Sequence, residues 1–461
     1  MKNKRVVYRI SNGIIVVAVI AILVIFNIFV RDASWKIDLT QAGMYKLSQQ
    51  TIDYISTLED KTTLKILEKD GNSDDYIIKI AKLYPKYSDN IEVEMIDPDA
   101  NPGLIAKYLK KDSTLMYGSI VIDNGKNWDV VNSYGTVVKN SEGSIVSKVE
   151  RKITSAIYKI NSEQKNTIYL LTGHGERTLA EIYQIKEDLG DISYTVNELN
   201  LFEEGKIPED IYSLAILGPT MDISDRECEI ILEYIKNGGN LTIAIDVDAK
   251  GESYNNIKKL AKEYNLSIDD NYICESDGHY VQDQVMALIP KLSSNEITNE
   301  LIASKVNIFM PLVRSISVLD EDNKDVKISP FLVTTEKAWS RTDLNNPVKD
   351  VNDKVGVFNL AVSAVKTIDE KESKLVIFGS SNIIDYRIIE KYSTGNKDLF
   401  ISSLKWFKDD SFNMVDVPEK VVRQDHYKID GKTAKNLILA AMMVPLFFAT
   451  IGAVVYVARR D

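Results

Sequence analysis

A glycine-rich turn holds the residues of this sequence that are best suited to chemistry. The turn runs from Gly173 to Arg177 (Gly-His-Gly-Glu-Arg) and follows a short apolar run, Thr167 to Leu171. Because glycine adopts positive φ without strain, the turn would let its backbone approach a ligand closely. His174 and Glu176 together could exchange protons with a substrate near neutral pH. The alternative is a structural turn in which His174 bonds a backbone carbonyl and Glu176 caps the next helix.

A second polar turn, Gly379 to Asn382, follows another apolar run, Ser373 to Phe378. Open α/β sheets bind ligands beyond the carboxyl ends of their strands, so we expect the two turns to share one rim. The candidate ligand or partner rim comprises Gly173, His174, Gly175, Glu176, Arg177, Gly379, Ser380, Ser381 and Asn382.

The sequence offers no clear nucleophile, cofactor site or metal site. Cys228 falls inside a predicted amphipathic helix, and no G-x-S-x-G elbow or G-x-x-x-x-G-K-[ST] loop is present. Asp246 and Asp248 could bind a cation, but paired carboxylates at one turn are more often solvated. Three scattered histidines do not make a metal site. We therefore expect no catalytic residues, no cofactor and no metal.

The rim requires a sheet that brings strand ends together. Between residues 147 and 410, apolar strands alternate with amphipathic helices, which predicts a parallel-sheet α/β domain covered on both faces. A segment between Asn307 and Val333 is expected to add strands in an insertion or at an edge. The expected helices are 147–160, 179–189, 225–236, 255–264 and 398–407, and the expected strands are 167–171, 193–196, 213–217, 240–246, 356–365 and 373–378.

A smaller α/β domain is expected from residue 36 to 140. Ser48 is a candidate N-cap for a first helix, and strands are expected at 62–67 and 91–96 around a helix at 74–87. Strands 119–123 and 128–131 flank Asn124-Gly125, which is a strong hairpin signal. This order indicates a thioredoxin-like domain, but without Cys-x-x-Cys it implies no redox chemistry.

Each end of the chain carries an apolar run long enough to cross a membrane. Ile14 to Val30 would reach roughly 25 Å as a helix, and Leu437 to Val457 is a second such run. Basic residues precede the first run and follow the second, which predicts that residues 1–13 and 458–461 are cytoplasmic. A cleaved signal peptide is the alternative for the first run, but Arg31 and Asp32 stand where small residues would be needed.

The charge and the cysteine content of the sequence argue against two classes of protein, nucleic-acid-binding proteins and disulfide-rich proteins. The 461 residues carry a net charge of −11 although both ends are basic, so the middle is acidic and nucleic acid is not an expected partner. Two cysteines provide no disulfide framework, and the sequence leaves open whether Cys228 and Cys274 pair.

The order of motifs resembles the gliding-motility G-type auxiliary family of ABC transporters. The matching stretches are DLTQAGMYKLSQQT, MIDPDANP, YLLTGHGE, LAILGPT, YIKNGGNLTIAID, VIFGSSNIID and GNKDLFISSLKWFKDD, between two terminal spans. The resemblance implies a membrane component that works with an ABC permease and a separate ATPase. It also implies an amidotransferase-like α/β core without the catalytic cysteine, and no catalytic residues to transfer.

Three functions follow from these observations. The first is a non-enzymatic, two-pass auxiliary subunit in the plasma membrane, whose extracytoplasmic domain contacts substrate, envelope or partner subunits. The second is an anchored hydrolase or amidotransferase relative that uses His174 and Glu176. The third is a module that binds a peptide or glycan at the rim. The transported substrate, the direction of transport, the stoichiometry and homodimer formation stay open.

Overall fold

A computed structural model describes most of the chain between the two terminal runs. The described residues are 44–69, 76–109, 115–139, 144–162, 166–247, 254–276, 278–281, 284–392, 394–408 and 417–423. The predicted spans 14–30 and 437–457 lie outside these residues. Among the helices that the structure describes, none is both long and apolar enough to cross a bilayer.

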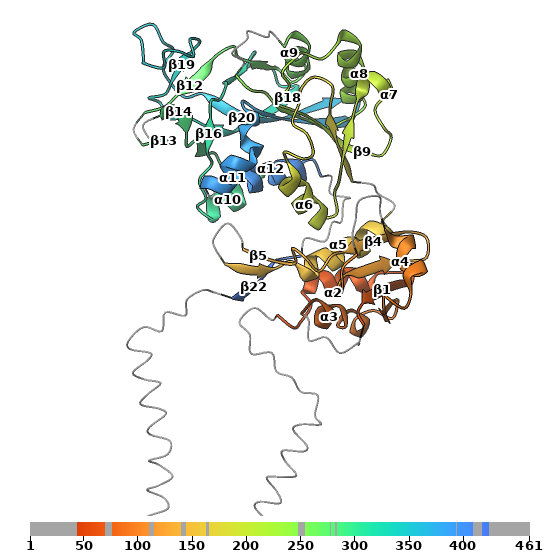
Figure 1. Ribbon diagram of the computed structural model, residues 1–461. Helices are drawn as coiled ribbons and strands as arrows, with labels where there is room; N and C mark the ends of the chain where they lie inside the picture. The colour runs from red at the N-terminus through yellow and green to blue at the C-terminus, as the bar shows by residue number, and fades with distance from the viewer. Residues whose placement is uncertain are drawn as a thin grey trace, which may run out of the picture.

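The first unit is built on a four-stranded sheet with the order β2-β1-β3-β4 (Figure 1). Strands β1 and β2 are parallel, whereas β3 is antiparallel to β1 and forms a hairpin with β4. Gly125 has φ +84° at the hairpin turn, a conformation that favours glycine. The predicted β-α-β order followed by a hairpin is confirmed. The strands are β1 (Thr62–Leu67), β2 (Ile91–Ile96), β3 (Ile120–Asp123) and β4 (Trp128–Val131).

Helices pack on this sheet through one apolar cluster that includes Ile55, Ile77, Ile153 and Ile157. Ser48 caps the first helix, as predicted, because its Oγ accepts a hydrogen bond from Thr51 N. The helices are α2 (Gln49–Ser56), α3 (Tyr76–Ala81), the 3₁₀ turn η1 (Tyr84–Lys86), α4 (Pro102–Tyr108) and α5 (Val149–Asn161).

The predicted helix over 74–87 was wrong at its end. The helix α3 ends at Ala81, and a separate 3₁₀ turn begins at Tyr84. Pro85 explains the break, since proline lacks the N–H that an α-helix needs and constrains the residue before it.

The second unit is built on an eight-stranded sheet with the order β15-β18-β20-β21-β10-β9-β7-β8. Strands β8, β7, β9, β10 and β21 are parallel to one another. Strands β20, β18 and β15 extend the sheet by antiparallel pairing. The strands are β7 (Thr167–Leu171), β8 (Thr195–Leu199), β9 (Ile211–Leu217), β10 (Leu241–Ala244), β15 (Lys291–Leu292), β18 (Val326–Val333), β20 (Asn359–Ile368) and β21 (Lys371–Phe378).

The predicted all-parallel sheet is therefore corrected to a mixed sheet. A strand that is buried on both faces reads as a continuous apolar run whatever its direction, so the pattern of β20 did not reveal its orientation. The loop between β20 and β21 consists of Asp369 and Glu370, which have φ +47° and +67°. This two-residue hairpin has positive φ at both loop positions without the glycine or asparagine that usually signals it.

Helices cover both faces of the large sheet (Figure 1). One apolar cluster includes Leu189 and Leu404, and the other includes Ile231 and Leu260. The helices on the first side are α6 (Tyr183–Asp191), α10 (Asn299–Ala303), α11 (Tyr386–Tyr392) and α12 (Asn396–Lys405), and those on the second are α7 (Leu201–Glu204), α8 (Asp225–Lys236) and α9 (Asn255–Lys262). Helix α6 begins four residues later than predicted, and α8 has the predicted bounds.

Short strands between residues 266 and 341 form three small sheets beside the large one. The 307–333 region contributes short strands to these small sheets and, through β18, a strand of the large sheet that lies next to the edge strand β15. The predicted strands of this region are therefore present. The remaining strands are β11 (Leu266–Ile268), β12 (Tyr272–Cys274), β13 (Tyr280–Val281), β14 (Gln284–Leu288), β16 (Met310–Pro311), β17 (Ile316–Val318) and β19 (Trp339–Arg341).

A three-stranded sheet with the order β22-β6-β5 lies where the two units meet (Figure 1). Strands β5 (Val137–Lys139) and β6 (Ile145–Ser147) precede α5, whereas β22 (Lys420–Arg423) follows the whole second unit. The last described strand thus returns to the first unit and pairs antiparallel with β6.

Candidate functional site

The parallel strands bring four turns to one edge of the large sheet. The order β21-β10-β9-β7 places the turns after these strands next to one another. The predicted turns Gly173–Arg177 and Gly379–Asn382 follow β7 and β21, and the Gly218 and Asp246 turns lie between them. The connections from β7 to β8 and from β9 to β10 use helices on opposite faces, so this edge contains a topological switch point.

Arg177 joins the two predicted turns directly. Its Nε donates to Ser381 Oγ at 3.1 Å, and its Nη2 donates to Asn382 Oδ1 at 3.4 Å. Its Nη1 also lies 3.7 Å from Asp385, whose side chain is buried. The backbone N–H of Arg177 donates to Leu217 O, so the turn is also attached to the end of β9. The nine sequence-predicted residues thus occupy one contiguous rim.

Two carboxylates hold His174 at its two ring nitrogens. Nδ1 lies 3.1 Å from Glu176 Oε1, and Nε2 lies 3.1 Å from Glu227 Oε2. Both glutamate side chains are almost fully buried. Glu227 is fixed in turn by a capping box with Ser224 at the start of α8. Glu227 was not among the residues predicted for this site, although its position three residues after Ser224 is a capping signal.

This arrangement favours the charged imidazolium. A neutral imidazole donates from one nitrogen only, so one carboxylate would face a lone pair. The hydrogen bond to Glu176 raises the pKa of His174, burial opposes it, and the charges of Glu176 and Glu227 raise it further. Because each ring nitrogen lies 3.1 Å from a buried carboxylate oxygen, both nitrogens of His174 are occupied by protein partners. The turn therefore has the geometry of a structural clamp.

Close packing fills the space between the turns. A Cβ on Gly175 would lie 2.1 Å from Thr220 Oγ1, and one on Gly218 would lie 2.6 Å from Ser381 Oγ. The Gly379 turn meets the backbone of Arg314, where a Cβ would lie 2.2 Å from its carbonyl oxygen. The rim is closed and polar at these contacts, which does not favour a peptide or glycan groove.

The remaining sequence candidates have structural partners. Asp246 accepts hydrogen bonds from Ser380 Oγ, Ser381 N and Ser381 Oγ, and Asp248 lies outside the described residues. The described residues contain no cluster of His, Cys, Asp and Glu that could hold a metal ion. Cys228 and Cys274 are both buried and unpaired. Burial raises the pKa of each thiol, to about 12 for Cys274, so neither is poised as a nucleophile.

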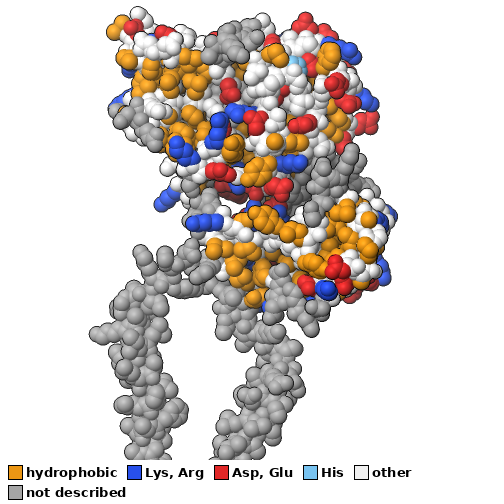
Figure 2. Space-filling view, in the orientation of Figure 1, with side chains coloured by type: hydrophobic (Ala, Val, Ile, Leu, Met, Phe, Trp, Pro, Cys, Tyr) orange, Lys and Arg blue, Asp and Glu red, His pale blue; other side chains and the backbone are white. Residues whose placement is uncertain are grey.

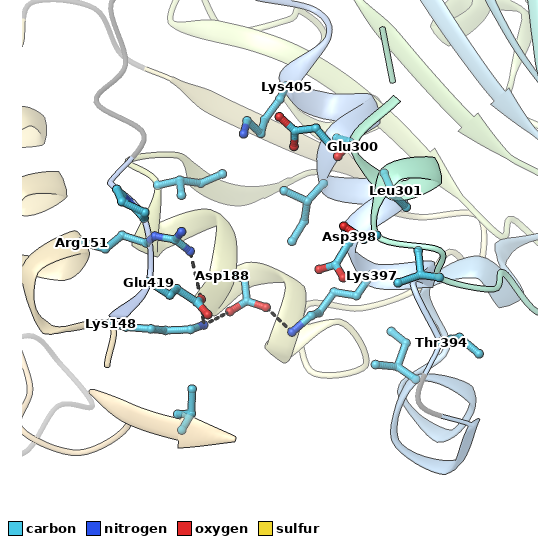
Figure 3. A pocket seen from close by; sticks show the side chains of 18 of the residues that line it. Lys148, Arg151, Asp188, Glu300, Leu301, Thr394, Lys397, Asp398, Lys405 and Glu419 are labelled. Carbon is cyan, nitrogen blue, oxygen red and sulfur yellow. Dashed lines mark hydrogen bonds and ion pairs between the residues drawn. The ribbon is translucent and has the colours of Figure 1, made fainter. Parts of the chain in front are cut away.

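A cleft of about 980 Å³ opens between the two units, away from the rim (Figure 3). It is lined by β5, the start of α5, the helices α6, α10, α11 and α12, and residues 418–419. Figure 2 shows acidic and basic side chains gathered along this boundary. Cavities at domain interfaces of this size commonly bind ligands.

Ion pairs connect the walls of the cleft. Lys148, before α5, lies 2.5 Å from Asp188 of α6, and Lys397 of α12 lies 2.5 Å from the same carboxylate. Arg151 pairs with Glu419 at 3.1 Å. Burial lowers the pKa of Lys148, but its acidic neighbours outweigh burial and raise the pKa overall. Sequence reasoning missed this cleft because its charges come from segments far apart in the chain.

The two ends of the described chain meet at Glu150, beside the cleft. Glu150 Oε1 accepts hydrogen bonds from the N–H and the hydroxyl of Ser48, each at 2.6 Å. Its Oε2 lies 2.6 Å from Lys420 Nζ, which also donates to the carbonyl of Lys46. Glu150 is only 3% exposed, so one buried carboxylate holds segments from both ends.

Comparisons with known proteins find one family and several distant structures. The family model described as "ABC-type uncharacterized transport system" matches residues 165–403. No curated protein matches the sequence. The N-terminal domain of mmIFT52 is similar at 14% identity with a TM-score of 0.41, covering 53% of this chain and 99% of that one. A ThuA-like protein from Bacteroides uniformis is similar at 13% identity with a TM-score of 0.33, covering 54% and 95%.

Proposed function

This chain belongs to the ABC-transporter auxiliary family, and from that membership we propose that it is a non-enzymatic, membrane-anchored subunit of an ABC transporter complex. The family supports an auxiliary role in a transport system. The order of motifs supports the gliding-motility G-type branch of that family. We further infer that a permease and a separate ATPase are its partners, because the chain contains no nucleotide-binding loop of its own.

The convergence of both chain ends on Glu150 carries the proposal. Ser48 and Lys420 both bind the buried Glu150 carboxylate, and Lys420 also donates to the carbonyl of Lys46. The described region therefore begins and ends with segments that contact each other, which suits two anchors in one membrane. The apolar runs 14–30 and 437–457 with their basic flanks provide those anchors. In this arrangement both termini are cytoplasmic and the α/β units are extracytoplasmic.

Two measurements test this proposal, one on wall-stripped cells and one on native membranes. Protease added to wall-stripped cells should digest the region between the two runs, and tags at residues 1 and 461 should stay protected. Affinity purification from native membranes should recover a permease and an ATPase. If the tags are cleaved while the α/β units survive, the orientation is inverted and the proposal fails. If neither partner is recovered after mild solubilisation and cross-linking, the transporter assignment fails.

The His174 clamp argues against the enzyme alternative. We expect His174→Gln and Glu176→Gln to lower the stability of the fold and, through it, the amount of assembled complex. A catalytic role would give a different result, with normal folding and normal complex assembly but complete loss of function. Thermal unfolding and copurification of the same variants separate these outcomes.

A further inference from the structure

We propose that Glu150, Ser48 and Lys420 form a clasp that couples the separation of the two chain ends to the cleft between the units. Residues 417–423 are called the strap. The coupling is a property of the chain itself. Its use by moving membrane partners rests on the proposed function.

The clasp contacts both the N-terminal segment at Ser48 and the strap at Lys420, so separating these two segments would break it. One carboxylate oxygen of Glu150 binds the N-terminal segment through Ser48, and the other binds Lys420 of the strap. Lys420 also reaches the carbonyl of Lys46, so the two ends contact each other directly. Glu150 and Lys420 are buried, and Ser48 is half-buried. Removing Lys420 would leave a buried carboxylate without its cation, which is costly.

The strap continues from the clasp into the wall of the cleft. Arg151 follows Glu150 on α5; its Nε donates to Val417 O at 2.7 Å, and its Nη1 pairs with Glu419. Pro418 and Glu419 line the cleft. Figure 3 shows Arg151, Glu419, Lys148 and Asp188 as a connected row along one side of the cleft. Displacing the strap would therefore remove part of that wall.

The same row reaches the second unit. Lys148 lies 3.9 Å from Glu419 and 2.5 Å from Asp188 on α6. It also lies 3.3 Å from Asp191, which pairs with Lys152. The start of α5 thus binds the strap on one side and α6 on the other. Lys148, Glu150 and Arg151, which are neighbours around the first residue of α5, transmit a change at the clasp to α6.

Hydrogen exchange of the full chain in nanodiscs tests the coupling without any partner protein. In Lys420→Met we expect amides of residues 145–147 and of 183–191 to exchange at least tenfold faster than in the wild type. Amides of β9 and β10 should be unchanged. The control is Lys126→Met, which removes an exposed ion pair with Asp60 in the first unit and should change neither peptide. Faster exchange confined to residues 417–423 would overturn the proposal.

A disulfide across the strap provides a second, independent test if Lys420→Met does not fold. Val146 and Val421 are cross-strand partners in the β6–β22 pair. Antiparallel partners lie within the Cα separation that a disulfide spans. In Val146→Cys/Val421→Cys, oxidation should slow exchange of residues 183–191 in mild urea at least tenfold, and reductant should reverse the effect. Equal exchange in the oxidised and reduced forms would overturn the proposal. Cys228 and Cys274 are buried and do not compete.

Discussion

His174 Nε2 and Glu227 Oε2 lie 3.1 Å apart and join the turn after β7 to the first turn of α8. Glu176 contacts the other ring nitrogen, so His174 and the two glutamates form a buried charge cluster. The sequence motif that suggested acid–base chemistry is therefore part of this cluster. The cluster fills the switch point at which α/β sheets usually bind ligands. Its contribution is therefore expected in stability rather than in turnover.

The first prediction concerns pH. The raised pKa of His174 means that its stabilising contribution is fully present below its unfolded pKa and is lost as pH rises through its folded pKa. The difference in unfolding free energy between wild type and His174→Gln should therefore be larger at pH ~6 than at pH ~9. Urea titrations of both proteins across this range measure it. A difference that is constant with pH would show that folding does not raise the pKa of His174.

The second prediction concerns the packing of the rim. Gly218 has φ +66°, and a Cβ there would meet Ser381, so Gly218→Ala should lower the unfolding free energy by roughly 1–3 kcal/mol. A Cβ added to Gly103 in α4 would meet nothing within 4 Å. Gly103→Ala is the matched control and should be neutral or stabilise by up to about 1 kcal/mol. Urea unfolding compares the two, and equal effects would contradict a filled rim.

The third prediction concerns the cleft. Asp188 is half-buried, and although burial raises its pKa, Lys397 and Lys148 lower its pKa more. Its contribution to stability is thus present above the unfolded pKa and is lost as pH falls through the folded pKa. Asp188→Asn should cost roughly 1–3 kcal/mol of unfolding free energy at neutral pH.

The control for Asp188→Asn is Glu92→Gln, whose carboxylate forms an exposed pair with Lys61 at 3.4 Å. That substitution should change the unfolding free energy by no more than about 0.5 kcal/mol. Chemical denaturation of both variants at neutral pH provides the comparison. If Asp188→Asn is as mild as the control, the ion pairs do not hold the units together.

The fourth prediction concerns thiol reactivity. Burial raises the pKa of Cys228 and of Cys274, so neither thiol should react with maleimide in the folded chain. Both should react after denaturation, and Tyr134→Cys, at a position that is 84% exposed, should react at once in the folded state. Intact-mass spectrometry counts the adducts. Labelling of either native cysteine without denaturant would contradict the buried environment.

Local sequence patterns predicted those helices and turns whose ends are marked by capping or turn residues. Helix α8 has the predicted bounds because Ser224 starts it with a capping box and Asn237-Gly238-Gly239 ends it. The β3–β4 hairpin followed from Asn124-Gly125. The two rim turns were expected to be neighbours because parallel strands end at one edge, and Arg177 indeed contacts Ser381.

Features that depend on distant segments could not be read from local patterns. The antiparallel direction of β20 was hidden by its burial on both faces and by a turn without glycine. The clamp partner Glu227 is brought to His174 by the packing of α8. The pairing of β22 with β6 has no local signal, because a four-residue strand gains its stability from a partner elsewhere.

The pairing of β22 with β6 also sets an order in biosynthesis. Strand β6 lies between β5 and β22, so one side of it has no partner until the last described residues have been made. An unpaired strand edge is an aggregation hazard in a growing chain. A product cut short before Lys420 would expose that edge and leave Glu150 without its counter-ion. The part of the chain that the structure describes therefore cannot close its interior strand edge until its last strand, β22, has been synthesised.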